Sequence, residues 1–194
     1  MFLEPHFSGQ RSGWIEVICG SMFSGKTEEL IRRLKRARIA GQRIEVFKPK
    51  IDTRYGDAKV VSHDSNSLLA TPITDTSKLL LVPDDVTVIG LDEAQFFEPA
   101  IVDHVVELAN RGKRIVIAGL DMDFRGKPFG PICNLLAVAE YITKVHAICS
   151  HCGALATHSY RKTQNQDTVM LGETDLYEAR CRRCYAMGNI LELK

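Results

Sequence analysis

The stretch at residues 20–30, GSMFSGKTEEL, joins an apolar run to a charged segment with helical spacing. A glycine, four further residues and Gly-Lys-Thr form the pattern of a phosphate-binding loop, or P-loop. The two glycines let backbone amides converge on phosphate oxygens, because a Cβ there would crowd the ligand. Lys26 can bind the β- and γ-phosphates, and the hydroxyl of Thr27 can bind Mg²⁺. The predicted nucleoside triphosphate site consists of Gly20, Ser21, Met22, Phe23, Ser24, Gly25, Lys26 and Thr27.

Patterns typical of strands and of helices alternate around this loop. Four short apolar runs predict buried strands, at residues 14–19, 43–49, 86–97 and 114–120. Apolar residues at helical spacing predict helices at residues 27–41 and 99–112, and the polar residues 50–70 are predicted to form a loop. This alternation indicates an α/β fold with a parallel sheet that helices cover on both faces.

The chain of 194 residues is long enough for one domain with a small additional unit. After about Val145 the apolar runs give way to cysteines, turns and polar residues. We therefore expect a flexible N-terminal tail at residues 1–13, a nucleotide-binding domain at 14–145 and a second, smaller domain at 146–194.

Composition excludes several classes of partner. The formal net charge is +1, without the basic excess that binds nucleic acid non-specifically. No apolar run approaches the length of a membrane span, and the N-terminal residues lack an apolar signal core after a basic start. We expect a cytoplasmic protein with reduced cysteines that binds neither nucleic acid nor membranes. Cys19 and Cys133 lie among apolar residues and are predicted to be ordinary core cysteines.

Two acids follow the third predicted strand, in the sequence TVIGLDEAQFF at residues 87–97. A P-loop enzyme needs an acid at the end of a nearby strand to hold the magnesium shell, and Asp92 has that position. Glu93 is placed to take a proton from a nucleophile. The pair does not identify that nucleophile: water would make the protein an ATPase, and a substrate hydroxyl would make it a kinase. A helicase is disfavoured, because helicases need two such domains and a positively charged track for the strand.

Four of the six cysteines form two CxxC pairs, Cys149 with Cys152 and Cys181 with Cys184. Two such pairs can hold one tetrahedral zinc ion, and a closed site of four thiolates is structural rather than catalytic. The alternatives are two unrelated turns or a redox pair. His151 is expected to be exposed rather than a ligand, because four sulfurs suffice.

Several motifs, in order, resemble those of the type II thymidine kinases, the cellular-type family of bacteria and animals. The resemblance covers residues 14–185 and rests on GSMFSGKT, KPKIDTRY, SHD at 62–64, LDEAQFF, GLDMDFRGKPFG and the two CxxC pairs. It implies a RecA-like P-loop kinase domain followed by a zinc-binding domain with a lasso-like loop. In that family the glutamate of DEAQFF is the general base on the nucleoside 5′-hydroxyl, which here is Glu93.

The resemblance also implies positions for both substrates. ATP would contact Ala94 and Gln95 in addition to the P-loop and the two acids, and Thr27 and Asp92 would hold magnesium. Lys26, Glu93 and Arg54 would be catalytic. Phe124 is suited to stack on a pyrimidine. The residues that match the family's thymidine-binding positions are Met22, Asp52, Leu120, Phe124, Phe129, Ser159, Met170, Leu171, Gly172 and Tyr177.

The sequence thus predicts an ATP-dependent kinase that phosphorylates thymidine, and deoxyuridine, at the 5′-hydroxyl to give dTMP for nucleotide salvage. Its predicted cofactors are Mg²⁺ and a structural Zn²⁺. The resemblance further implies a homotetramer, and feedback inhibition by dTTP is a property of relatives. The alternatives are a zinc-stabilised nucleotide-binding regulatory protein without turnover and a nucleic-acid-dependent ATPase.

Overall fold

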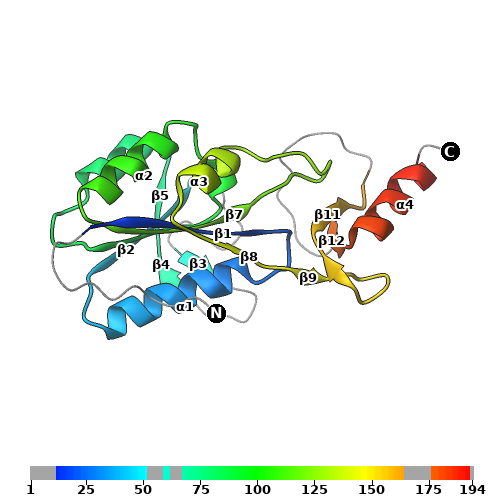
Figure 1. Ribbon diagram of the computed structural model, residues 1–194, viewed down its shortest axis with the longest axis horizontal. Coiled ribbons are helices and arrows are strands. Elements are labelled where there is room, and N and C mark those ends of the chain that lie inside the picture. The colour runs from blue at the N-terminus through cyan, green and yellow to red at the C-terminus, as the bar shows by residue number, and fades with distance from the viewer. Residues whose placement is uncertain (1–11, 52–58, 62–66, 164–175, 193–194) are drawn as a thin grey trace.

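The computed structural model describes residues 12–51, 59–61, 67–163 and 176–192. Its centre is a six-stranded sheet in the order β5-β2-β6-β7-β1-β8, in which every neighbouring pair is parallel (Figure 1). The strands of this sheet are β1 (Trp14–Gly20), β2 (Ile44–Pro49), β5 (Thr71–Ile73), β6 (Val88–Leu91), β7 (Arg114–Leu120) and β8 (Tyr141–Lys144). The predicted α/β fold with a parallel sheet is confirmed.

Helices cover both faces of the sheet. α1 (Lys26–Ile39) lies on one face, and α2 (Ile101–Asn110) and α3 (Ile132–Val138) lie on the other (Figure 1). Successive residues of a strand point to opposite faces. Val116 accordingly packs in one buried cluster with Leu34 of α1, whereas Ile117 packs in another with Leu108 of α2. The short 3₁₀ helix η1 (Thr76–Leu81) adds Leu79 to the cluster beneath α2.

The structure departs from the predicted strands at three places. The strand predicted at 86–97 ends at Leu91, because Glu93 adopts a left-handed conformation and Ala94–Phe96 form a 3₁₀ helix, η2. Edge strands β5 and β8 were not predicted, since each is short and only partly buried. The loop predicted at 50–70 includes an antiparallel pair, β3 (Lys59–Val61) and β4 (Ser67–Leu69). The predicted helices are confirmed as α1 and α2.

The chain beyond β8 forms a smaller unit of paired strands and one helix (Figure 1). β9 (Ala147–Ile148) pairs with β10 (Leu155–Ala156), β11 (His158–Arg161) pairs with β12 (Tyr177–Arg180), and α4 (Arg182–Glu192) follows. Both strand pairs are antiparallel. The domain boundary at residue 145 stays a prediction, and most of the predicted tail at 1–13 lies outside the described residues. Within the described part of the chain, no helix is both long enough and apolar enough to cross a membrane.

One charged cluster lies inside the sheet layer, beneath α1. The carboxylate of Glu16 on β1 is fully buried and accepts hydrogen bonds from Arg33 of α1 at 2.9 Å and from Arg114 of β7 at 2.7 Å. Trp14 also donates its indole N–H to this carboxylate, at 2.7 Å. Arg33 donates in addition to Thr143 of β8, so the cluster joins three strands to the helix that begins at the P-loop.

We expect Glu16→Gln to lower the free energy of unfolding by about 3–5 kcal/mol, because it removes the negative charge that two buried guanidinium groups contact. Arg33 also pairs with Glu29 at 2.8 Å, so Arg114 is the more strongly affected of the two. Urea denaturation of wild type and variant measures this difference. The matched control is Asp85→Asn, which removes the exposed partner of Arg43 and should cost at most about 1 kcal/mol. Equal small losses in the two variants would show that the buried cluster does not stabilise the sheet.

Candidate functional site

The candidate site lies at the carboxyl edge of the sheet, where the parallel strands end together. Gly20, the last residue of β1, is in register with Leu120, the last residue of β7. β6 ends at Leu91 on the other side of β7, immediately before Asp92. The P-loop, the two acids and the segment after β7 therefore meet at one edge, which is where open α/β sheets bind ligands.

The P-loop runs from β1 into the first turn of α1. Gly25 is the N-cap residue of α1, with φ of 81°, and has no side chain to cap the helix. The N-terminus of a helix favours an anion, because its first backbone N–H groups point toward it. Gly20 has φ of 150°, and a Cβ on it would lie 2.2 Å from the carbonyl oxygen of Val145. Lys26 donates from Nζ to the carbonyl oxygen of Ser21 at 2.7 Å, inside the loop. The loop thus presents one ammonium group and a row of backbone donors.

Thr27 and Asp92 lie together, as predicted for a magnesium site. The hydroxyl oxygen of Thr27 is 3.3 Å from one carboxylate oxygen of Asp92 and 3.4 Å from the other. Neighbouring oxygens around an octahedral Mg²⁺ are about 3.0 Å apart, since each is about 2.1 Å from the metal. The spacing and the hard oxygen donors therefore fit Mg²⁺.

Glu93 is held in an unusual backbone conformation next to this pair. Its φ is 51°, and among the described residues only Phe23 shares a positive φ without being glycine. Such a conformation costs roughly 1–3 kcal/mol and persists only when its surroundings fix it. Gln95 supplies one such contact: its side chain is buried, accepts from the backbone N–H of Leu120 at 2.9 Å and donates to the carboxylate of Glu93. One amide therefore ties the acid to the end of β7.

The P-loop also contacts the C-terminal unit. The backbone N–H of Met22 donates to the hydroxyl oxygen of Ser159 on β11 at 2.9 Å. The side chain of Phe23 packs against the small buried cluster of that unit, which consists of Ala147, Cys149, Ala156 and Ala179. Ser159 is buried, and its hydroxyl can still donate its own proton to a ligand.

An aromatic group lines the edge after β7. Phe129 and Phe96 contact edge to face, with ring centroids 5.6 Å apart. The guanidinium carbon of Arg161 lies 3.6 Å from the centroid of the Phe124 ring, so it covers one face of that ring. The guanidinium carbon of the exposed Arg125 lies 5.0 Å from the same centroid. A pyrimidine stacked on Phe124 would have to lie on the face opposite Arg161. The hydroxyl of Tyr177 accepts hydrogen bonds from the same Arg161.

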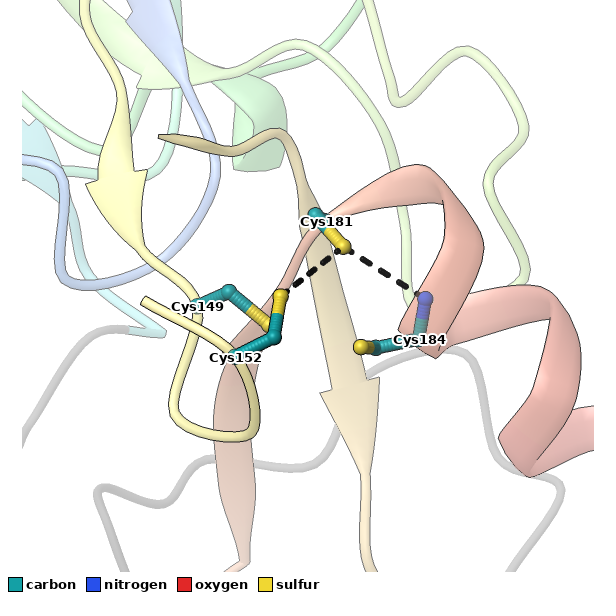
Figure 2. A group of neighbouring side chains, drawn as sticks. All are labelled: Cys149, Cys152, Cys181 and Cys184. Atoms are coloured by element: carbon teal, nitrogen blue, oxygen red, sulfur yellow. Dashed lines mark hydrogen bonds between the residues drawn. The ribbon is translucent and has the colours of Figure 1, made fainter. Parts of the chain in front are cut away.

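The four cysteines of the CxxC pairs converge on one point (Figure 2). Cys149 and Cys152 come from the turn between β9 and β10, while Cys181 and Cys184 come from the end of β12 and the start of α4. Their sulfur atoms all lie within 4.8 Å of one another, and those of Cys152 and Cys181 are 3.6 Å apart. Thiolates around a tetrahedral zinc ion are about 3.8 Å apart, because each Zn–S bond is about 2.3 Å. The cluster fits a structural zinc ion.

Hydrogen bonds within this cluster change the pKa values of the thiols of Cys149 and Cys184. Burial raises the pKa of Cys149, but backbone N–H groups of Cys181, His151 and Cys152 donate to its sulfur and bring that pKa down to about 6. Hydrogen bonds with Cys152 and Cys181 raise the pKa of Cys184 to about 12, since the protonated form is the donor. Four sulfurs this close do not all ionise without a cation, and a zinc ion supplies that charge.

Comparison with known proteins identifies the family. The family model described as thymidine kinase matches residues 13–185 of this chain. The chain belongs to the thymidine kinase family. It is 57% identical over 186 residues to the thymidine kinase of Bacteroides fragilis (strain YCH46), covering 95% of this chain and 94% of that protein. It is 58% identical over 177 residues to the thymidine kinase of Rhodothermus sp. (strain ITI 518), covering 91% of this chain and 83% of that protein.

Membership of the thymidine kinase family does not test the individual site predictions. The structure brings together the P-loop, Asp92, Glu93, Gln95 and the aromatic residues after β7. The remaining predicted site residues, Asp52, Arg54, Met170, Leu171 and Gly172, lie outside the described residues.

Two residues of the site were missed from the sequence, and one cysteine was misplaced. Phe96 directly follows Gln95, and an aromatic residue so close to the two acids was the available signal. Arg161 gave no local signal, because its contacts come from residues distant in sequence. Cys133 was wrongly predicted to be a core residue: it is exposed on α3, which turns Ile132 and Leu135 inward instead. Cys19 is buried and His151 is exposed, as predicted.

Proposed function

We propose that this protein transfers the γ-phosphoryl group of ATP to the 5′-hydroxyl of thymidine, and of deoxyuridine, giving dTMP or dUMP. The observation that carries the proposal is the meeting of the P-loop, the Thr27–Asp92 pair, Glu93 and Gln95, which binds the end of β7, at one edge of the sheet. The chain that carries these groups belongs to the thymidine kinase family, which supports the same reaction. We propose that the phosphate donor binds at the P-loop and that the acceptor binds at the aromatic residues after β7.

The triphosphate binds along the P-loop in this proposal. Lys26 exchanges its contact with the carbonyl of Ser21 for the β- and γ-phosphates, and the backbone N–H groups at the start of α1 face the phosphate oxygens. Mg²⁺ held by Thr27 and Asp92 would neutralise charge on the phosphate oxygens when it is bound.

Glu93 accepts the proton of the nucleoside 5′-hydroxyl. The resulting oxygen attacks the γ-phosphorus, the bond from this phosphorus to the bridging oxygen breaks in line, and ADP leaves with the electron pair. Gln95 holds the carboxylate of Glu93 toward the end of β7, where the acceptor pocket begins. Arg54 is proposed to approach the transferred phosphoryl group, on the strength of the resemblance of KIDTRY to its relatives.

The nucleoside base is proposed to bind among Met22, Leu120, Phe124, Phe129 and Tyr177. Phe96 contacts Phe129 edge to face. Ser159 and the backbone of Met170, Leu171 and Gly172 are proposed to read the edge of the base. Closure of the lasso over the nucleoside would exclude water and so favour transfer over ATP hydrolysis.

Several finer points belong to the same proposal. The four cysteines hold one structural zinc ion, the protein acts as a homotetramer, and dTTP inhibits it by binding where the substrates bind. A cytoplasmic location suits the zinc site, because thiols stay reduced there.

We expect deoxycytidine to be a far poorer substrate than thymidine, with kcat/KM lower by roughly tenfold to a hundredfold or more. Cytosine reverses the donor and acceptor at the base edge, and each buried group left unpaired costs about 1–3 kcal/mol. Deoxyuridine lacks only a methyl group, so its loss should be the smaller one. Steady-state rates with the three nucleosides and ATP test the proposal. Efficient phosphorylation of deoxycytidine would contradict the proposed reading of the pocket.

A further inference from the structure

A single arginine connects two aromatic side chains of the acceptor pocket. Arg161 lies on β11 directly opposite Tyr177 on β12, and its side chain is almost fully buried, with 4% of its surface exposed. Its Nη2 and Nε donate to the hydroxyl oxygen of Tyr177 at 2.6 and 3.0 Å. The short pair of hydrogen bonds fixes the position of the Tyr177 ring, which is itself buried.

The same guanidinium lies over the second aromatic ring, that of Phe124. Its central carbon is 3.6 Å from the centroid of Phe124, within the range of a cation–π contact. The backbone of Phe124 is held separately, because Tyr185 donates its hydroxyl to the Phe124 carbonyl at 2.7 Å. The preceding Asp123 closes the turn by accepting from the backbone N–H groups of Arg125 and Lys127, both at 2.9 Å. The loop thus fixes the backbone of Phe124. Of the two guanidinium groups near its ring, the buried Arg161 is the closer at 3.6 Å, and the exposed Arg125 lies at 5.0 Å.

Only arginine can make both contacts at once. Its planar guanidinium offers two parallel N–H donors at its edge and a flat cationic face for the ring. A lysine in the same place could donate to Tyr177 or approach Phe124, but its compact ammonium has no flat face. Phe124 and Tyr177 come from distant parts of the chain, the loop after β7 and the C-terminal unit.

We propose that Arg161 is a positioning residue for pyrimidine recognition. It holds the rings of Phe124 and Tyr177 in fixed positions relative to each other, and the parts of these rings that Arg161 does not cover contact the base. The inference rests on the proposed function, since it assigns both rings to the thymidine pocket. It predicts a loss in nucleoside binding, while the P-loop and the handling of ATP stay as they are.

The test compares Arg161→Met with wild type in steady-state kinetics and in thymidine binding by calorimetry. We expect KM and Kd for thymidine to rise roughly ten- to a hundredfold, as for loss of hydrogen bonds from a charged group. The values of kcat at saturating thymidine and KM for ATP should stay within about twofold of wild type. Arg161→Lys should recover part of the thymidine affinity, because it keeps the charge and one donor.

Arg180→Met is the matched control. Arg180 lies on the neighbouring strand β12, and its guanidinium stacks on Tyr160 at 3.3 Å while Nε donates to Glu178 at 2.6 Å. It therefore makes the same kind of contact in the same small sheet, but on a different ring. We expect Arg180→Met to lower the melting temperature, because it removes these contacts, and to leave KM for thymidine unchanged.

A second variant, Tyr177→Phe, tests the proposal even if Arg161→Met does not fold. Tyr177→Phe keeps the ring and removes the acceptor of both hydrogen bonds, so it should raise KM for thymidine on its own and add little to the effect of Arg161→Lys. Fully additive losses in this double-mutant cycle, or a thymidine Kd within about twofold of wild type in the folded variants, would overturn the inference. A wild type that binds thymidine without phosphorylating it would instead contradict the proposed function.

Discussion

Glu93→Gln should lower kcat with thymidine and ATP by roughly two to four orders of magnitude, the usual contribution of a general base. The substitution keeps the shape of the side chain and its place beside Gln95, but an amide does not accept the proton of the 5′-hydroxyl. The new side chain keeps an acceptor oxygen for the amide of Gln95, so the left-handed backbone at residue 93 should be retained. Binding of ATP and of thymidine should stay within about threefold of wild type, since neither depends on the proton transfer.

Single-turnover rates and calorimetric Kd values separate these two effects. Glu107→Gln provides the control, because Glu107 is exposed on α2 and pairs with Arg111 away from the carboxyl edge of the sheet. This control should keep the wild-type rate. Near-normal turnover in a folded Glu93→Gln protein would remove Glu93 from the mechanism.

Loss of the zinc ion should have the second large effect. The buried cluster of the C-terminal unit contains small side chains and one of the four cysteines, so little apolar burial remains to hold it without metal. Binding of a structural zinc ion contributes roughly 10–16 kcal/mol in small zinc domains. We expect purified protein to carry about one zinc ion per chain and Cys152→Ser to lose it.

The consequences of zinc loss should follow the contacts of this unit. Ser159, Arg161 and Tyr177 lie on its strands, so thymidine affinity should fall by more than about tenfold. ATP affinity should fall less, because the P-loop contacts the unit only through part of its length, at Met22 and Phe23. The six-stranded sheet should stay folded, which a separate, unchanged high-temperature transition in calorimetry would record.

Cys133→Ser serves as the control for zinc loss. Cys133 is exposed on α3 and lies apart from the metal cluster, so this variant should keep both the zinc ion and the activity. Metal analysis that finds no zinc in freshly prepared, reduced wild-type protein would contradict the assignment of the four cysteines.

The parts of the fold and site that were predictable from the sequence are those with local spacing. The P-loop, the acids after β6 and the CxxC pairs each need only a few neighbouring residues to be recognised. β1 and β7 are continuous apolar runs, α1 and α2 carry apolar residues at helical spacing, and the structure has all four where they were expected. β8 has four residues at an edge of the sheet, which is too short for its pattern to stand out.

The parts that were not predictable depend on contacts between distant segments. The hydrogen bond from Met22 to Ser159 joins residues far apart in the chain, as does the stacking of Arg161 on Phe124. The strand predicted at 86–97 is shorter in the structure, where β6 ends at Leu91. Buried apolar residues continue to Phe97, but Glu93 turns the backbone out of the sheet. The strand propensity of these residues favours a longer strand, but the backbone conformation at Glu93 ends it.

The central claim is that Glu93 directs the γ-phosphoryl group of ATP to the 5′-oxygen of thymidine. The most direct measurement follows γ-labelled ATP with wild type and Glu93→Gln, in the presence and absence of thymidine. We predict that wild type places nearly all of the transferred label in dTMP, in a thymidine-dependent reaction, and that Glu93→Gln forms almost none. Release of the label as inorganic phosphate at a rate that does not depend on thymidine would contradict the account.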